Sequence, residues 1–381
     1  MFSHRFDTSW STVETLSPSR RTYDVGDPAI ASLLWDPHYG SAGGLDASVA
    51  AESAAVKHAV FANQIFPIVP LYVTSICAEH CTYCNYRVEN KGVDVERLRL
   101  GDSELLHEAE FLISQKGLRV IELVYATDPR VRVDAICRHI ELVRNLLEHH
   151  GGGMVGINCE AFDEADYRQM RSAGLEFAVL WMETYDRTRY EEVHQGATKK
   201  TRFEYRLDGY ERMIAAGLKY FGMGVLSGLS DWRRDWAMLM QHEAYLAREY
   251  GRAAAILGVP RLKNAAGAKL TDTGFIPTAQ EFVTTVALHN RFSPGTLPFV
   301  STREEWDVCL RLSAGGGCLF TFNCATIPGG YSLGHGGYQF PTLSFDAPLY
   351  APKLMDEGFL PRFDWSTEVF ESVRALEPAH V

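Results

Sequence analysis

The most regular feature of the chain is an alternation of short apolar runs with amphipathic stretches, which begins at residue 67. Eight runs rich in β-branched and aromatic residues follow one another. Each run is too short for a helix and too continuous for a strand with one exposed face, so each predicts a strand buried in a parallel sheet. The runs cover residues 67–76, 119–126, 153–160, 176–183, 219–226, 253–260, 296–303 and 317–324.

The stretches between the runs predict helices. Residues 101–117 begin with capping Asp and Ser residues, carry an apolar stripe and close with a glycine, and residues 133–153, 163–174 and 204–217 end in the same way. Eight strands alternating with helices predict an α/β protein with a (β/α)8 TIM-type barrel, in which chemistry lies at the carboxyl ends of the strands.

We expect the barrel to occupy residues 67–345. Residues 1–66 then form an N-terminal helical extension, in which the Ala-rich segment 47–61 favours a helix. Residues 346–381 form a C-terminal extension. A single barrel with two extensions accounts for the length of 381 residues.

Charge and apolar content narrow the classes of function. The net charge of −11 argues against a nucleic-acid-binding surface, which needs clustered Lys and Arg. The sequence has no apolar run long enough to span a membrane and no signal-peptide core at its start, so we expect a cytoplasmic location. Thiols stay reduced there, and the eight cysteines are then not a disulfide framework.

Three cysteines stand together just after the first predicted strand. Cys77, Cys81 and Cys84 have the spacing C-x3-C-x2-C. Clusters of the four-iron type take four ligands, so three thiolates leave one iron open to chelate a small molecule. A zinc site would need a fourth Cys or His, but His80 lies beside Cys81 and none follows within twenty residues. A disulfide and plain packing are the other interpretations.

The triplet, with Tyr83 before its last cysteine, resembles the signature of the radical S-adenosylmethionine superfamily. Residues 70–87 look like the cluster loop of the aromatic amino-acid lyase branch. That branch holds 2-iminoacetate synthase, a tyrosine lyase of hydrogenase maturation, and the tryptophan lyase 3-methyl-2-indolic acid synthase. Five further segments resemble the branch in the same order, namely residues 182–194, 222–235, 259–263, 301–306 and 326–332.

The resemblance implies a radical carbon–carbon lyase. Its cofactors would be a [4Fe-4S] cluster held by Cys77, Cys81 and Cys84, and S-adenosyl-L-methionine, whose cleavage releases a 5′-deoxyadenosyl radical. An external electron donor such as flavodoxin or ferredoxin would reduce the cluster. The substrate would be a free aromatic amino acid: L-tyrosine, giving p-cresol and dehydroglycine by Cα–Cβ cleavage, or L-tryptophan.

Three alternatives to this activity stay open. The tryptophan enzyme of the branch rearranges a carboxyl fragment onto the indole ring, and this chain could do the same. Radical chemistry on another small amino acid is the second alternative. A redox-sensing Fe–S protein without catalysis is the third, and it would bind a cluster yet leave S-adenosylmethionine intact.

The resemblance also implies roles for single residues. Glu183 and Arg206 would bind polar groups of S-adenosylmethionine, although a salt bridge at the barrel rim is the alternative. Arg303 would pair with the carboxylate of the substrate, with a structural ion pair to Glu304 or Glu183 as the alternative. Glu183 and Arg303 are therefore the expected catalytic pair, and the further expected cofactor contacts are Tyr83, Thr127, Gly224 and Leu226.

The chain departs from the branch pattern at three places. Residues 125–128 read Tyr-Ala-Thr-Asp where the branch usually has Gly-Glu, and Met182 stands in place of a glutamine. In the eighth strand the branch carries a cation where this chain has Ala325. The side chains expected to face the substrate there are Thr321, Phe322 and Asn323, and their change predicts a changed substrate or product.

Overall fold

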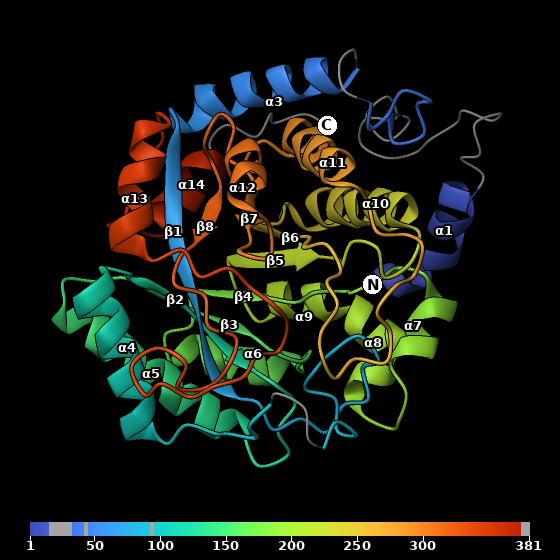
Figure 1. Ribbon diagram of the computed structural model, residues 1–381. Helices are drawn as coiled ribbons and strands as arrows, with labels where there is room; N and C mark the ends of the chain where they lie inside the picture. Colours follow the sequence, from blue (N-terminus) through green and yellow to red (C-terminus); the bar gives the residue numbers. More distant parts are fainter. Residues whose placement is uncertain (15–32, 42–44, 92–94, 375–381) are drawn as a thin grey trace.

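The structure, a computed structural model, describes residues 1–14, 33–41, 45–91 and 95–374. Its centre is a parallel barrel in which β2 to β8 neighbour one another in chain order, and β1 pairs with both β8 and β2 to close the ring (Figure 1). The barrel strands are β1 (Gln64–Thr74), β2 (Val120–Tyr125), β3 (Met154–Asn158), β4 (Phe177–Val179), β5 (Tyr220–Gly224), β6 (Ile256–Gly258), β7 (Leu297–Val300) and β8 (Leu319–Thr321).

The predicted (β/α)8 barrel is confirmed. Each apolar run coincides with one barrel strand, because residues buried on both faces of a parallel sheet leave a continuous apolar signature. A short ninth strand, β9 (Leu360–Pro361), pairs with the start of β1.

Helices surround the barrel (Figure 1). Residues 204–217, expected as one helix, form α8 and α9, which are separated at Asp208. The Asp208 carboxylate accepts hydrogen bonds from the main-chain N–H and the hydroxyl of Ser3, which ties the start of the chain to this break. The helices are η1 (Phe2–His4), α1 (Phe6–Glu14), α3 (Leu45–Phe61), α4 (Asp102–Lys116), α5 (Val133–His149), α6 (Glu164–Ser172), α7 (Arg187–Val193), η2 (Lys199–Thr201), α8 (Phe203–Leu207), α9 (Gly209–Ala215), α10 (Trp232–Tyr250), α11 (Ala279–Phe292), α12 (Trp306–Leu312), α13 (Ala347–Asp356) and α14 (Glu368–Arg374).

Helix α3 lies beside the amino ends of β7 and β8. Its fully buried Lys57 donates hydrogen bonds to three main-chain carbonyls that precede β7 and β8, those of Pro294 (3.0 Å), Thr296 (2.6 Å) and Gly317 (3.2 Å). The opposite end of the barrel, where the strands finish, is left for a site. Among the described residues, no helix is long and apolar enough to cross a membrane.

Candidate functional site

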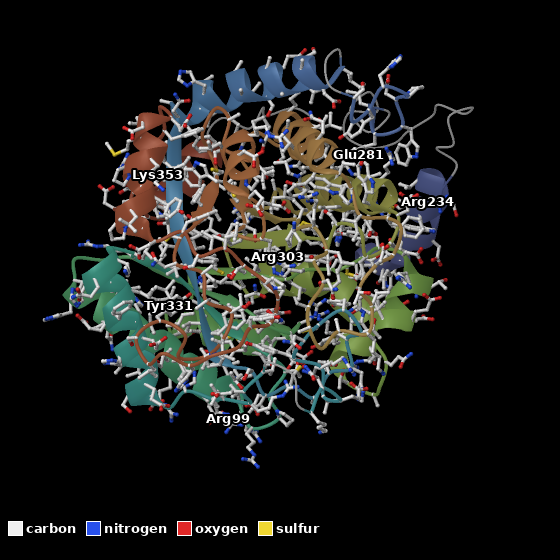
Figure 2. All side chains as sticks on the ribbon, viewed as in Figure 1. Arg99, Arg234, Glu281, Arg303, Tyr331 and Lys353 are labelled. Atoms are coloured by element: carbon white, nitrogen blue, oxygen red, sulfur yellow. The ribbon has the colours of Figure 1, made fainter. Side chains whose placement is uncertain are left out.

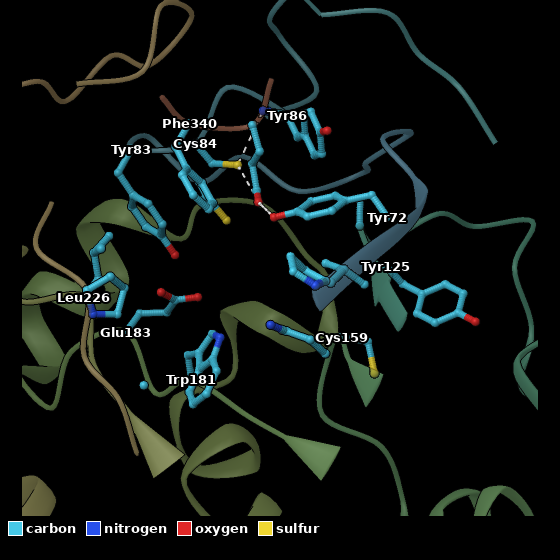
Figure 3. Close-up of a pocket in the computed structure, with 18 of the residues that line it drawn as sticks. Tyr72, Tyr83, Cys84, Tyr86, Tyr125, Cys159, Trp181, Glu183, Leu226 and Phe340 are labelled. Carbon is cyan, nitrogen blue, oxygen red and sulfur yellow. Dashed lines mark hydrogen bonds between the residues drawn. The ribbon is translucent and has the colours of Figure 1, made fainter. Parts of the chain in front are cut away.

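A cavity lies at the carboxyl ends of the strands and reaches into the barrel. All eight strands, or the loops that follow them, contribute to its wall, and so does the loop that carries the three cysteines (Figure 3). This convergence is the general property of a TIM barrel that the strand pattern predicted. Residues far apart in the chain, such as Cys77, Glu183 and Arg303, therefore line one space.

The cysteine loop presents its thiols to this cavity as an Fe–S cluster requires. The main-chain N–H groups of Glu79 and Tyr86 donate to the sulfurs of Cys77 and Cys84, each at 3.4 Å. The side-chain amide of Gln339 donates to Cys84 Sγ as well, at 3.5 Å. Hydrogen bonds to cluster sulfurs are one of the means by which proteins tune such clusters. The residues present thus fit the group.

Burial keeps the thiols of Cys77 and Cys81 protonated in the absence of a bound metal. It raises the pKa of Cys77 to about 11 and the pKa of Cys81 to about 12. Within the described ranges, no three Cys, His, Asp or Glu side chains converge as ligands of a single ion. A zinc site needs donors about 2.3 Å from one point. A four-iron cluster does not, because each thiolate bonds to a different iron.

Glu183 follows β4 and stands opposite the cysteines in the cavity. Its backbone has φ 71°, in the left-handed region that side chains other than Gly rarely adopt, and its carbonyl accepts from Leu226 N. Such conformations concentrate at functional sites. The carboxylate pairs with Lys200 Nζ (3.0 Å) and Arg206 Nη2 (3.7 Å). Burial opposes ionisation, but these two cations overcome it and hold the pKa of Glu183 below its usual value.

Arg206 is positioned for a ligand. Its Nε donates to the carbonyl of Trp181 at 2.7 Å, whereas its buried Nη1 has no hydrogen-bond partner among the described residues. An unpartnered guanidinium N–H beside an ionised Glu183 suits a zwitterionic or hydroxyl-bearing ligand such as S-adenosylmethionine. Here, too, the residues present fit the cofactor.

Lys200 is a site residue that the sequence analysis missed. It lies in the middle of η2, where the surrounding residues, ATKKT, suggest only a solvated loop. The fold brings its ammonium to Glu183 and over the ring of Tyr83, 5.9 Å from the centroid. Tyr83 itself is fixed by a 2.7 Å hydrogen bond between its hydroxyl and His194 Nε2.

Arg303 follows β7 and lies in the middle of the molecule (Figure 2). Its guanidinium stacks on the ring of Phe340, 3.3 Å from the centroid, and no salt bridge joins it to a carboxylate of the described residues. Loss of hydration lowers the pKa of Arg303 below its ordinary value. A half-buried cation without an acidic partner is a binding site for an anion.

Glu304, the alternative ion-pair partner expected for Arg303, forms its ion pairs with other residues. Arg261 holds the buried Glu304 carboxylate through two hydrogen bonds, one of them 3.0 Å from Nε to Oε1, and Lys263 lies 3.6 Å from the same group. The ion pair between neighbours in sequence is therefore absent. Arg261, which belongs to the segment 259–263, is the structural partner of Glu304 instead.

The remaining predicted site residues divide into two groups. Thr127, Leu226 and Thr321 line the cavity. Gly224, Phe322 and Asn323 do not. A Cβ at Gly224 would lie 1.7 Å from a carbonyl oxygen of the neighbouring strand, so this glycine permits close strand approach rather than contact with a ligand.

Phe322 and Asn323 turn away from the cavity for different reasons. Phe322 directly follows the inward-facing Thr321, and successive side chains of a strand point to opposite faces, whereas Asn323 lies beyond the end of β8. Phe322 packs outside the barrel against Phe320, with ring centroids 4.9 Å apart. Asn323 takes a left-handed φ of 49°, donates to Asp346 and accepts from Ala347 N at the start of α13. The structure thus leaves only Thr321 of the three residues to face a substrate.

Comparisons with known proteins agree with this site. Residues 71–240 match the family described as the Radical SAM superfamily. 2-Iminoacetate synthase of Escherichia coli (strain K12) is 28% identical over 280 residues, which cover 72% of this chain and 70% of that protein. 3-Methylornithine synthase of Methanosarcina acetivorans is 28% identical over 151 residues, 40% of this chain and 41% of that protein.

A likeness in structure extends over nearly the whole chain. The crystal structure of HydG, a maturase of the [FeFe]-hydrogenase, superimposes with a TM-score of 0.82 at 23% identity, and covers 97% of this chain and 80% of HydG. At that identity the likeness concerns the fold. Residues 71–240, which include the cysteine triplet, are thus similar to the Radical SAM superfamily, whose members work with a [4Fe-4S] cluster and S-adenosyl-L-methionine. The similarity to 2-iminoacetate synthase supports the aromatic amino-acid lyase branch of that superfamily.

Proposed function

We propose that this radical SAM enzyme cleaves the Cα–Cβ bond of a free aromatic amino acid, L-tyrosine or L-tryptophan. The observation that carries the proposal is Arg303, a cation that pairs with no carboxylate of the described residues and faces the same cavity as Cys77, Cys81 and Cys84. A free amino acid always brings a carboxylate, and an arginine binds it bidentately. The name of the relative 2-iminoacetate synthase is consistent with a glycine-derived product.

The residues that line the cavity have separate roles in the proposed reaction. When bound, the cluster and S-adenosylmethionine supply a 5′-deoxyadenosyl radical, the hydrogen-abstracting group of the family. Glu183, Lys200 and Arg206 hold polar groups of the cofactor. Arg303 anchors the substrate carboxylate and thereby fixes the amino group and Cα relative to the cofactor. Trp181 and Phe299, which line the cavity 5.9 Å apart in an edge-to-face arrangement, surround an aromatic side chain and exclude water.

The test is an anaerobic incubation of the reconstituted protein with a strong reductant, S-adenosylmethionine and either tyrosine or tryptophan, followed by mass spectrometry. We expect 5′-deoxyadenosine together with a cleaved or rearranged product of one amino acid. The variant Arg303→Met should lose consumption of the amino acid but still form 5′-deoxyadenosine slowly. Arg311→Met, which changes an arginine of α12 outside the cavity, is the matched control.

Two results would reject parts of the proposal. Formation of 5′-deoxyadenosine without consumption of either amino acid excludes this substrate class. A cluster-bearing protein that leaves S-adenosylmethionine intact under reduction is a redox sensor instead.

A second candidate function is radical chemistry on another small amino acid. Ala325 in place of the usual cation of the eighth strand favours it, as does the partial similarity to 3-methylornithine synthase. An amino-acid panel, scored by substrate-dependent 5′-deoxyadenosine, separates the two.

A further inference from the structure

A buried carboxyl group lies on the floor of the cavity. Glu122, on β2, is only 4% exposed, yet it lines the same cavity as the cysteines and Arg303. Its Oε1 has no hydrogen-bond partner among the described residues. Asn158, at the end of the neighbouring strand β3, is its hydrogen-bonding neighbour and lines the cavity too. None of the roles assigned above uses either residue.

Glu122 points inward and lies deeper than the cofactor residues. Val120, two positions earlier on β2, packs in the cluster that fills the barrel, and alternate residues of a strand share a face. Glu122 precedes Val124 by two residues, and so lies about 7 Å further down the strand. Arg303, in contrast, follows the end of β7. The cavity therefore has a cation at its mouth and a carboxyl group on its floor.

Part of the wall of this cavity is aromatic. Trp181 and Phe299 both line it. The indole of Trp181 fits because Gly258 has no side chain: a Cβ at that position would lie 2.4 Å from the ring. An apolar wall with one polar group at each end is the usual design of a pocket that binds and orients a small amphipathic molecule.

Asn158 offers Glu122 one hydrogen bond, but no described residue partners its Oε1, so the lost hydration is only partly replaced. A buried polar atom without a partner destabilises a protein, and a leucine of similar size would pack in the lumen without this penalty. Burial raises the pKa of Glu122 to about 8, so the carboxyl group carries its proton at neutral pH. A neutral carboxyl group both donates and accepts, and the amide of Asn158 does the same.

We propose that Glu122 and Asn158 form the recognition site for a hydrogen-bond donor at the far end of the substrate side chain. The substrate is then an aromatic amino acid with such a donor, the phenol of tyrosine or the indole N–H of tryptophan, and phenylalanine is rejected. This inference rests on the proposed function, because Arg303 must hold the carboxylate for the side chain to reach the floor. A site built around a hydrogen bond discriminates strongly, since the analogue without the donor leaves Glu122 unpaired.

The test is equilibrium binding of tyrosine, tryptophan, phenylalanine and lysine to the reconstituted protein with S-adenosylmethionine, measured by calorimetry. Wild type should bind tyrosine or tryptophan about 10- to 100-fold more tightly than phenylalanine. Glu122→Leu should reduce this ratio to within roughly threefold, with an unchanged or raised thermal midpoint. Glu122→Gln, which keeps the size and a polar group, should give an intermediate ratio and serves if the leucine variant does not fold.

The matched control is Glu176→Gln. Glu176 is also a partly buried carboxyl group, and burial raises its pKa to about 7. Its carboxylate, however, accepts a hydrogen bond from Val155 N and lies outside the cavity. This variant should leave the ratio unchanged. An unaltered ratio in both Glu122 variants overturns the inference, and so does tight binding of lysine that depends on Glu122, since the donor would then be an ammonium group. If tyrosine binds with the expected dependence on Glu122 but is not cleaved, the inference stands and the proposed lyase activity fails.

Discussion

Replacing Gln339 by leucine should lower the reduction potential of the bound cluster. The Gln339 amide bridges two groups: its Nε2 donates to Cys84 Sγ at 3.5 Å, and its Oε1 accepts from the hydroxyl of Tyr72 at 2.7 Å (Figure 3). A donor directed at a thiolate stabilises the reduced cluster more than the oxidised one, because the reduced cluster carries one more negative charge. Removing the donor therefore makes reduction harder.

The magnitude follows from the energy of one hydrogen bond. A typical intramolecular hydrogen bond contributes about 1 kcal/mol net. For a one-electron couple, about 59 mV corresponds to a factor of ten, or roughly 1.4 kcal/mol. If most of the hydrogen-bond energy is specific to the reduced state, the loss is about 40 mV.

The assay is a redox titration of the reconstituted protein, followed by the electron paramagnetic resonance signal of the reduced cluster. Tyr72→Phe is the matched control, since it removes only the hydroxyl that orients Gln339 and should shift the potential less. The comparison is valid only if each variant binds four iron ions, because three bound iron ions would show a damaged cluster. A potential in Gln339→Leu that is unchanged or higher would refute the reasoning.

Three other predictions concern groups that the fold buries. Lys57→Met removes the donor to three main-chain carbonyls under the barrel, so the free energy of unfolding measured in urea should fall by about 2–4 kcal/mol; an equally stable variant would contradict this. Glu122 has its pKa raised by burial from 4.5 to about 8, so the folded state retains a proton that the unfolded state releases. The stabilisation that comes from this retained proton is fully present below pH 4.5 and is lost as the pH rises towards 8, by at most about 1.4 kcal/mol per pH unit. Urea titrations at several pH values should show that the free energy of unfolding of Glu122→Leu lacks this decline. Lys200→Met removes the nearest cation from Glu183, so the pKa of Glu183 should rise and S-adenosylmethionine should bind about tenfold more weakly in a calorimetric titration; unchanged affinity would remove Lys200 from the site.

The barrel and the cysteine triplet at its mouth could be predicted from the amino-acid sequence. Eight apolar runs predict eight strands because a strand buried on both faces is apolar along its length, which is a local property. The triplet Cys77, Cys81 and Cys84 is equally local, since its spacing lies within one loop. Glu183 and Arg303 were predicted because each belongs to a segment that resembles the branch and follows a strand, and Arg206 was predicted from the resemblance alone. All three line the cavity.

The tertiary structure alone decided which side chains share the cavity and which are already paired. Arg261 pairs with Glu304 across two loops and Lys200 pairs with Glu183, and no carboxylate of the described residues pairs with Arg303. Asn323 is lost from the cavity because it lies beyond the end of β8 and bonds to Asp346 and Ala347, whereas Phe322 faces outward because it alternates with Thr321. Glu122 and Asn158 belong to different strands, so only the register between β2 and β3 brings them together on the cavity floor.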